Sequence, residues 1–462
     1  MATGRYNDAP AHLPLGGGVG SGSKDYGMNR NLTAAREQAY FELQKRIQTL
    51  LINDLELNKG KMEHYSQKQL KDEVAERLHR ILDAEVSKQQ LPMSKTERAI
   101  LFDRCIAEIL GYGPIEPLLR DDNITEIMVR GPHNVWVDQR KGKMIKVDIH
   151  FQDDDHLKRI IERIVSQINR RVDEMTPMVD ARLLDGSRVN IVIPPIALDG
   201  AMLTIRKFSA KPLQPQNLVD NGAVSPDMML FLQRCVEARM NIIVSGGTNT
   251  GKTTLLNVLS VFIPPDQSIV TIEDSAELQL QQANVRRMES RPANVEGKNQ
   301  ITIRQLVANA LRMRPDRIIV GECRGGEALD MLQAMNTGHE GSMTTLHANT
   351  SRDVLNRLEM LVLQTGIDLP ERAIHEQILS AVNLIVQLKH FEDGSRRISS
   401  IAELRRGGGD GIEVVDIFEF ERTGMDSKGH VTGRLRPTGV RPRLLETMEQ
   451  LGHPVPPTMF QR

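Results

Sequence analysis

The amino-acid sequence predicts an α/β protein, with a buried parallel sheet in the main domain and an α+β domain and a helical module before it. From about residue 225 onward, short apolar runs alternate with helical patterns, which is typical of consecutive βαβ units. Residues 114–210 combine several short strand patterns with one helical run. Residues 33–113 show only the period of amphipathic helices.

The N-terminal part begins with residues 1–32, which are rich in Gly, Ser, Pro and Ala and are predicted to form a disordered tail. The helical module follows in residues 33–113. Its last helix is expected to begin after Ser94, because Ser94 and Glu97 have the spacing of a capping box. We expect this helix to end at Gly111 and interpret the module as a packing or docking unit.

The segment 114–210 is predicted to be the α+β domain. Its helix should follow the three aspartates at 153–155, because acidic side chains favour the positive end of a helix. A hairpin is expected around Asp185-Gly186. Strand patterns stand at 124–129, 134–138, 182–195 and 202–208. Residues 211–224, which begin with a proline-punctuated stretch, are predicted to be a linker.

The main domain is predicted over residues 225–390. In parallel sheets of this kind, ligands bind at the carboxyl ends of the strands. Every motif described below follows a predicted strand of this domain. Residues 391–462 are predicted to be a C-terminal extension with a strand at 412–420, and no chemistry is assigned to them.

Composition limits the range of functions. Lys and Arg total 59 against 60 Asp and Glu, and aromatic residues make up 3%, so nucleic acid is not expected as a partner. The three cysteines lie far apart, which fits a reducing cytosol. No secretory signal and no apolar run of about 18–20 residues is present, so we expect a cytoplasmic protein without a membrane span. The cysteines are Cys105, Cys235 and Cys323.

The most specific motif is a glycine-rich loop between the apolar run 242–244 and a stretch of helix formers. Its glycines let successive N–H groups face one anion at a helix N-terminus. Lys252 can reach the β- and γ-phosphates of a nucleotide, and the Thr253 hydroxyl can ligate Mg²⁺. The sequence therefore predicts ATP and Mg²⁺ as ligands; a chance glycine turn is the alternative. The loop consists of Gly246, Gly247, Thr248, Asn249, Thr250, Gly251, Lys252, Thr253 and Thr254.

Carboxylates follow two other predicted strands. Glu273 and Glu277 stand in one acidic cluster, where they could polarise water or hold a metal beside a phosphate site. A solvated turn is the alternative for this cluster. Glu322 ends the strand that begins at Arg317, and Gly321 occupies the position where such enzymes usually have Asp. Glu322 is therefore the candidate Mg²⁺ residue, and an ordinary edge glutamate is the alternative.

Two histidines, His339 and His347, stand eight residues apart on a loop and a strand, which is not a standard metal pair. One of them could sense the γ-phosphate by hydrogen bonding, although a lone histidine is more often structural. Arginines could supply positive charge to a phosphoryl group, although most arginines are solvated surface residues. The candidates are Arg188, Arg206, Arg312 and Arg314.

In this order and spacing, the loop and three further segments resemble the type II/type IV secretion traffic-ATPase superfamily. These segments are IEDSAEL, LRMRPDRIIVGECRGGEALDML and AMNTGHEGSMTTLHANTSRDVLNRL. The upstream segments LGYGPIEPLLRDDNITEIMVRGP and ARLLDGSRVNIVIPP look most like the CpaF/TadA branch, the motors of tight-adherence (Tad) pili. The resemblance covers about residues 95–390.

The resemblance implies a RecA-like ATPase domain after a PAS-like α+β domain, in a ring of six identical subunits. It implies that ATP hydrolysis drives pilin assembly through an inner-membrane platform protein, at the cytoplasmic face of that membrane. Cys323 stands where the family has Val, and we expect no change in function because a buried Cys behaves as a small hydrophobe.

Matched motif by motif, the family's functional positions are the loop pair Lys252 and Thr253, the acidic-box residues Glu273 and Glu277, with Glu277 as the water activator, the Mg²⁺ residue Glu322, the histidine-box residues His339 and His347, and the nucleotide-facing arginines Arg188 and Arg206.

Three functions remain open at this point. The first is a motor for pilus assembly, with or without retraction, or for protein secretion. The second is a nucleic-acid translocase or conjugation ATPase, which the neutral charge and scarce aromatics disfavour. The third is a nucleotide-gated scaffold that does not hydrolyse ATP, which the carboxylates Glu277 and Glu322 disfavour.

Overall fold

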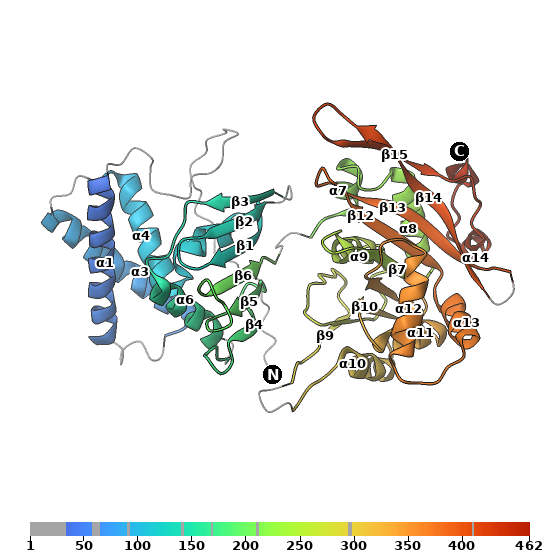
Figure 1. The fold of residues 1–462 in the computed structure, drawn as a ribbon, viewed down its shortest axis with the longest axis horizontal. Helices are drawn as coiled ribbons and strands as arrows, with labels where there is room; N and C mark the ends of the chain where they lie inside the picture. The colour runs from blue at the N-terminus through green and yellow to red at the C-terminus, as the bar shows by residue number, and fades with distance from the viewer. Residues whose placement is uncertain are drawn as a thin grey trace. The chain divides into compact units, whose positions relative to one another are not determined.

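The structure, a computed structural model, describes residues 34–57, 65–89, 93–139, 143–167, 170–208, 212–293, 298–408 and 411–462. The predicted tail, residues 1–32, lies outside these ranges. The chain forms two compact units that divide between Lys207 and Phe208 (Figure 1). Among the described helices, none is at once long enough and apolar enough to cross a bilayer.

Within the described ranges, the helical part of the first unit consists of three helices: α1 (Ala34–Leu57), α3 (Gln67–Gln89) and α4 (Lys95–Leu110). Their apolar faces share one buried core, which includes Leu43, Leu78 and Leu101. The α4 helix begins with the predicted capping box, in which the Ser94 side chain accepts from the Glu97 N–H. Gly111 caps its C-terminus, as predicted.

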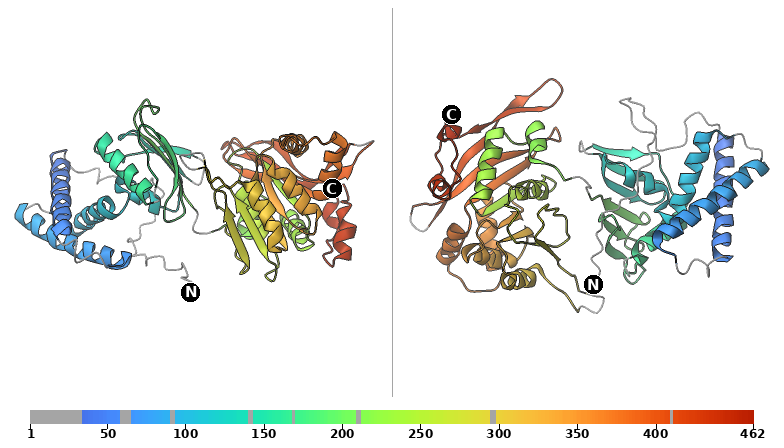
Figure 2. Two further views of the ribbon diagram at one scale, coloured as in Figure 1. Left: turned by 90° about the horizontal axis from the view of Figure 1, so that it is seen from below. Right: turned by 180° about the vertical axis from the view of Figure 1, so that it is seen from behind.

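The rest of the first unit is built on an antiparallel sheet, with helix α6 packed against it (Figures 1 and 2). Among the described residues the strand order is β3-β2-β1-β6-β5-β4. Apolar residues of α6 share a core with the strands, and Asp153 caps this helix. The elements are η1 (Gly113–Ile115), α5 (Glu116–Arg120), β1 (Ile124–Arg130), β2 (Val135–Gln139), β3 (Lys143–Val147), α6 (Asp154–Ser166), β4 (Met178–Arg182), β5 (Arg188–Val192) and β6 (Met202–Arg206).

The second unit is built on one large sheet, whose described strands have the order β15-β14-β13-β12-β7-β11-β10-β8-β9. Its elements are α7 (Pro215–Asp220), α8 (Pro226–Glu237), β7 (Ile242–Gly246), α9 (Lys252–Ser260), β8 (Ile269–Glu273), β9 (Val285–Glu289), α10 (Ile303–Ala310), η2 (Leu311–Met313), β10 (Arg317–Cys323), α11 (Glu327–Asn336), β11 (Met343–Leu346), α12 (Asp353–Leu363), α13 (Glu371–Ala381), β12 (Leu384–His390), β13 (Arg396–Arg406), β14 (Ile412–Met425), β15 (Val431–Pro437), α14 (Leu444–Gln450) and η3 (Pro457–Phe460).

Helices cover both faces of this sheet, so its central strands are buried on two sides (Figure 2). Ile242 and Val244 of β7 belong to the core formed with α8, α9 and α14. Ile243, which points to the opposite face, belongs to the core formed with α10 to α13. This explains why the strand reads as a continuous apolar run rather than an alternating one. The predicted α/β class is confirmed.

Two segments differ from the organisation that the sequence suggested. Helix α7 lies inside the predicted linker 211–224, and its Leu218 packs into the core of the second unit. The strands β13, β14 and β15 of the predicted C-terminal extension continue the same sheet, because β12 pairs with β13 in antiparallel register. Strand β9 was not expected, since its sequence VRRME is polar and it lies at the sheet edge.

Candidate functional site

The parallel strands β7, β11, β10 and β8 end side by side, and we call this edge of the sheet the carboxyl edge. The loop from Gly246 to Lys252 leaves β7 here and leads into α9. A Cβ on Gly246 would lie 2.5 Å from Thr250 Oγ1 and 2.8 Å from Leu388 O, so a side chain does not fit. Gly251 has φ +95°, which favours glycine. The predicted loop therefore forms, and two of its glycines are sterically required.

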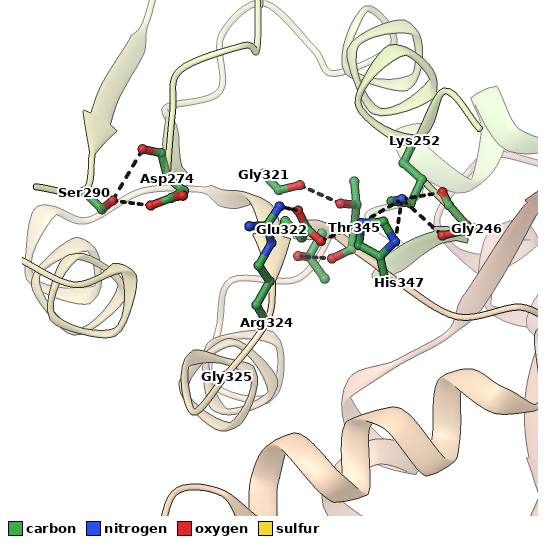
Figure 3. A network of polar contacts seen from close by, with 12 residues as sticks. Gly246, Lys252, Asp274, Ser290, Gly321, Glu322, Arg324, Gly325, Thr345 and His347 are labelled. Carbon is green, nitrogen blue, oxygen red and sulfur yellow. Dashed lines mark hydrogen bonds and ion pairs between the residues drawn. The ribbon is translucent and has the colours of Figure 1, made fainter. Parts of the chain in front are cut away.

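The Lys252 ammonium lies inside this loop (Figure 3). Its Nζ donates to Gly246 O at 3.1 Å and to Gly247 O at 2.9 Å, and it lies 3.3 Å from each ring nitrogen of His347. Burial lowers the pKa of Lys252, although the Glu322 carboxylate acts in the opposite direction. The ammonium is thus held by groups that a phosphate could replace.

A short chain of charged groups continues from Lys252 along the carboxyl edge. His347 Nε2 lies 3.0 Å from Glu322 Oε1, and Arg324 Nη2 lies 2.7 Å from Glu322 Oε2. Burial and the nearby Lys252 charge lower the pKa of His347. The neutral ring can accept from the Lys252 ammonium at Nδ1, whereas Glu322 Oε1 lies near Nε2 without a hydrogen-bond partner among the described residues. This chain brings together residues at the beginning of α9 and at the ends of β11 and β10, of which Lys252 and His347 are 95 positions apart.

The buried acidic residue of the predicted acidic box is Glu273, at the end of β8. It is 2% exposed, and its Oε1 accepts from the N–H groups of Glu277 at 2.8 Å and Leu278 at 2.9 Å. Burial raises the pKa of Glu273. A Cβ on Gly321 would lie 2.9 Å from Glu273 Cγ. This contact gives a physical reason for glycine where the motif usually has Asp.

Glu277 lies on the loop that follows β8 and is half-buried. Together with Asp274 it contributes to raising the pKa of Arg324, whose largest influence is its hydrogen bond to Glu322. Asp274 itself accepts from Ser290 Oγ at 2.7 Å (Figure 3). The carboxylates of Glu277 and Glu322 thus act on the same guanidinium from two strand ends.

The two predicted histidines are not neighbours in space. Strand β11 runs between them, so that His347 follows its carboxyl end while His339 precedes its first residue, Met343. The His339 carbonyl accepts from Ser342 Oγ at 2.7 Å at that opposite edge. Within this unit, only His347 joins the loop. The eight-residue spacing spans the buried strand β11, which agrees with the expectation that the two histidines are not a standard metal pair.

Two of the four candidate arginines belong to the second unit, which contains the loop, and two belong to the first unit. Arg312 belongs to η2 and Arg314 follows it, so both precede β10 at its amino end. Arg188 and Arg206 belong to the first unit, where they are directly opposite each other on β5 and β6. Arg182 of β4 faces Arg188 in the same row, so three arginines follow one another across three strands.

The donor atoms of the carboxyl edge suit a nucleotide with a magnesium ion. Thr253, the first residue after Lys252, is half-buried and offers a hydroxyl, and Glu322 offers a carboxylate. Hydroxyl and carboxylate oxygens are ligands of the type that Mg²⁺ prefers, alongside phosphate oxygens. Within the described ranges, no cluster of three or more His, Cys, Asp or Glu side chains forms a ready-made metal site.

Two arginines of the site were not singled out from the sequence. Arg324 follows Glu322 by two positions, so its place in a quoted motif could have indicated it. Arg396 of β13 donates from Nε to Asn249 O at 2.8 Å and from Nη2 to Asn249 Oδ1 at 3.1 Å. No sequence signal connects residues 147 positions apart.

Comparison with known proteins gives the family. A family model described as "Type II/IV secretion system protein" matches residues 108–398, and one described as "Type II secretion system protein E, N-terminal domain" matches residues 40–110. A putative conjugal transfer protein of Mycobacterium tuberculosis is 37% identical over 335 residues, which cover 71% of this chain and 94% of that protein.

Further relatives belong to type IV secretion. The type IV secretion system protein VirB11 of Bartonella henselae is 30% identical over 341 residues, covering 65% of this chain and 94% of the relative. The crystal structure of the VirB11 ATPase of Brucella suis, in complex with sulphate, is 30% identical, covers 63% of this chain and 92% of its own, and has a TM-score of 0.35. The chain therefore belongs to the type II/IV secretion system protein family, as a secretion- or conjugation-type ATPase related to VirB11.

Proposed function

We propose that this protein binds ATP at the loop 246–254 and hydrolyses it to ADP and phosphate. The observation that supports this most directly is the chain of Lys252, His347 and Glu322 at the carboxyl edge. It places a cation, a neutral imidazole and a carboxylate where phosphoryl transfer needs positioned charge.

Each residue then has a defined task. Lys252 leaves the carbonyls of Gly246 and Gly247 and neutralises the β- and γ-phosphates. Thr253 and Glu322 hold Mg²⁺, which when bound withdraws charge from the phosphate oxygens. Glu277 orients the attacking water from the loop after β8. His347 lies between the Lys252 ammonium and the Glu322 carboxylate and holds these two charged groups in position.

The test is phosphate release from the purified full-length protein with ATP and Mg²⁺. Lys252→Ala and Glu322→Gln are each expected to lower the rate about 100-fold or more, because each removes charge stabilisation of the transition state. Glu392→Gln, at an exposed carboxylate that pairs with Arg422, serves as the control. Full turnover in both site variants would show that the assignment of the site is wrong. Absence of phosphate release from the wild type would favour the non-hydrolysing scaffold.

We further propose that the hydrolysis powers Tad pilus assembly, with or without retraction, or protein secretion, by a ring of six identical subunits. The ring would act peripherally at the cytoplasmic face of the inner membrane, on a platform protein. Family membership and the upstream segments quoted above support this proposal. Turnover that rises when the platform protein is added, and hexamers in sedimentation experiments with ATP, are the expected results.

We also propose roles at the nucleotide for Arg188 and Arg206 of the first unit and for His339. Arg188 and Arg206 would approach the nucleotide as charge donors, and His339 would act in a histidine box. Replacement of each by Ala is expected to lower the turnover number without unfolding the protein. Unchanged turnover in a variant would remove that residue from the proposal.

A conjugation-type function is the second candidate, because a relative with 37% identity is described as a putative conjugal transfer protein. This function predicts that single- or double-stranded DNA binds with a strong salt dependence and stimulates turnover. The pilus and secretion proposals predict no such stimulation. Measuring turnover with and without DNA at two salt concentrations separates the two.

A further inference from the structure

Arg396, the first residue of strand β13, hydrogen-bonds to Asn249 of the phosphate-binding loop. We call Asn249 the apex of this loop. The Arg396 guanidinium makes a two-pronged contact with Asn249, at its backbone oxygen (2.8 Å) and at its side-chain oxygen (3.1 Å). Two parallel N–H donors on one planar group fix orientation as well as distance. Arg396 is also close to Gly251, because a Cβ there would lie 3.8 Å from Arg396 Cδ.

The residue at the apex adopts a conformation that needs support. Asn249 has φ +60°, in the left-handed region that costs most side chains energy and that Asn tolerates better than others. Because the peptide group is planar and trans, the Asn249 carbonyl and the Thr250 N–H point in opposite directions. A carbonyl held towards Arg396 therefore directs the Thr250 N–H away from it. Phosphate-binding loops need their N–H groups turned towards one anion.

The backbone around Arg396 is held in place by hydrogen bonds of the preceding turn. The turn before β13 is closed by Asp393, whose Oδ1 accepts from the N–H and the hydroxyl of Ser395. Its Oδ2 accepts from the Val431 N–H of β15 at 2.7 Å. Strand β12, to which Arg396 is joined through this turn, pairs with β7 at the beginning of the loop, Leu388 opposite Gly246.

The neighbouring arginine shows that this placement is selective. Arg397 points to the other face of the strand, where it lies 5.0 Å from the Phe420 ring centre and donates to Val431 O at 3.0 Å. Arg397 thus ties β13 to β14 and β15, while Arg396 reaches the loop. Arg396 thus connects a strand after residue 390 directly to the nucleotide site.

We propose that Arg396 is a positioning residue for nucleotide binding, which holds the apex of the loop in its phosphate-accepting conformation. The proposal rests on the proposed function, since it assigns Arg396 to the same ATP site. It also gives the strands β13 to β15 a part in nucleotide affinity.

The experiment compares full-length wild type with Arg396→Ala, Arg396→Lys and Asn249→Gly. Arg406→Ala is the matched control, because Arg406 ends the same strand and makes a two-pronged contact with Glu376 far from the loop. KM and the turnover number for ATP are measured together with the affinity for ADP. Hydrogen exchange of the peptide that covers the loop is measured in the nucleotide-free protein.

Arg396→Ala is expected to raise KM for ATP and the ADP dissociation constant about tenfold, while the turnover number changes less than about threefold, because two hydrogen bonds from a charged group are lost. The loop amides should exchange faster in this variant. Arg396→Lys should recover part of the affinity, since Lys keeps the charge but not the fork. Asn249→Gly should change KM only about twofold, because the backbone acceptor remains.

Three results would overturn the proposal. One is an Arg396→Ala KM equal to that of Arg406→Ala in an active enzyme, which leaves the ATPase function standing. Another is a raised KM with unchanged loop exchange, which would mean that Arg396 acts on the nucleotide rather than on the loop. The third is a loss of turnover in Arg396→Ala that is accompanied by a lower unfolding temperature and by no specific rise in KM. This result would mean that Arg396 has a purely structural role. Failure of the ATPase function itself would appear separately, as wild-type phosphate release no greater than that of Lys252→Ala.

Discussion

The two edges of the parallel sheet in the second unit both contain buried polar side chains, but these side chains have different kinds of partner. At the edge where the strands begin, which we call the amino edge, Arg317 is fully buried. It donates to Gln267 Oε1 at 2.5 Å and to Gly341 O at 3.3 Å. At the carboxyl edge, Lys252 contacts an ionisable side chain and two carbonyls of a glycine-rich loop.

Asn241 completes the amino edge. Its side-chain oxygen accepts from the Gly341 and Ser342 N–H groups, and its amide donates to the Met335 and Ala381 carbonyls. One buried side chain therefore joins the beginnings of β7 and β11 to the ends of two helices. No ligand can replace these partners without unfolding the chain, so the amino edge serves stability.

The different partners of the buried charges at the two edges indicate which edge of the sheet can bind a ligand. Burial of a charge costs free energy at either edge. At the amino edge, main-chain and amide partners offset part of that cost for Arg317 Nε and Nη1, while Arg317 Nη2 has no hydrogen-bond partner among the described residues. At the carboxyl edge, the partners are a histidine, a carboxylate and loop carbonyls, and a phosphate group can take the place of some of them.

The largest effect on stability is expected for Arg317→Ala. Because the guanidinium is fully buried, its removal leaves a cavity and unpaired acceptors, and we expect about 3–5 kcal/mol lower stability. Urea unfolding measures this change. Lys252→Ala is the counterpart at the other edge: it should lose ATP turnover while its free energy of unfolding changes by less than about 1 kcal/mol. An Arg317→Ala variant with wild-type stability would contradict the conclusion that the buried polar groups of the amino edge serve stability.

Gly321→Ala is expected to affect both stability and turnover, by about 1–3 kcal/mol in stability. The added Cβ would meet Glu273 Cγ at 2.9 Å and displace the strand end that holds Glu322. Thermal unfolding and phosphate release measure the two effects. Gly408→Ala is the control, since a Cβ at Gly408 would meet no atom within 4 Å. Equal results for the two variants would contradict the crowding at Gly321.

Turnover should depend on pH through His347. Burial lowers its pKa from the ordinary value of 6.5, so the ring is neutral at about pH 7 and gains a proton only below its unfolded pKa. As the pH falls through the folded pKa, the acceptor for Lys252 is lost, and we expect turnover to fall about tenfold per pH unit. His347→Asn should lack this dependence. The control His375→Asn, which removes a histidine paired with Glu359, should retain it.

The smallest effect is expected for Glu273→Gln. Burial raises the folded pKa of Glu273 above 4.5, so stability is lost as the pH rises from the unfolded pKa through the folded one. Gln keeps an oxygen for the two N–H groups without the charge. We expect equal stability or a gain of up to about 1 kcal/mol near pH 7, and a flatter stability profile with pH. Glu273→Ala, which loses the acceptor, should instead be less stable at every pH.

The sequence alone was sufficient to predict the local structure of several segments. The apolar run before Gly246 and the glycines after it predict a strand, an anion-binding loop and a helix, because these signals depend on neighbouring residues. The capping box at Ser94 and the hairpin around Asp185 were predicted for the same reason, and both are confirmed. The family resemblance is confirmed at the level of the type II/IV secretion superfamily, while the Tad branch remains a proposal.

The tertiary structure decided which residues meet. The sequence showed His339 and His347 eight residues apart without saying which of them would lie at the loop; strand β11 separates them, and His347 lies against Lys252. Arg396 reaches the same loop from 147 positions away, because β12 carries the chain back beside β7. Contacts of this kind depend on strand order, which the pairing of whole strands determines and which no short stretch of sequence contains.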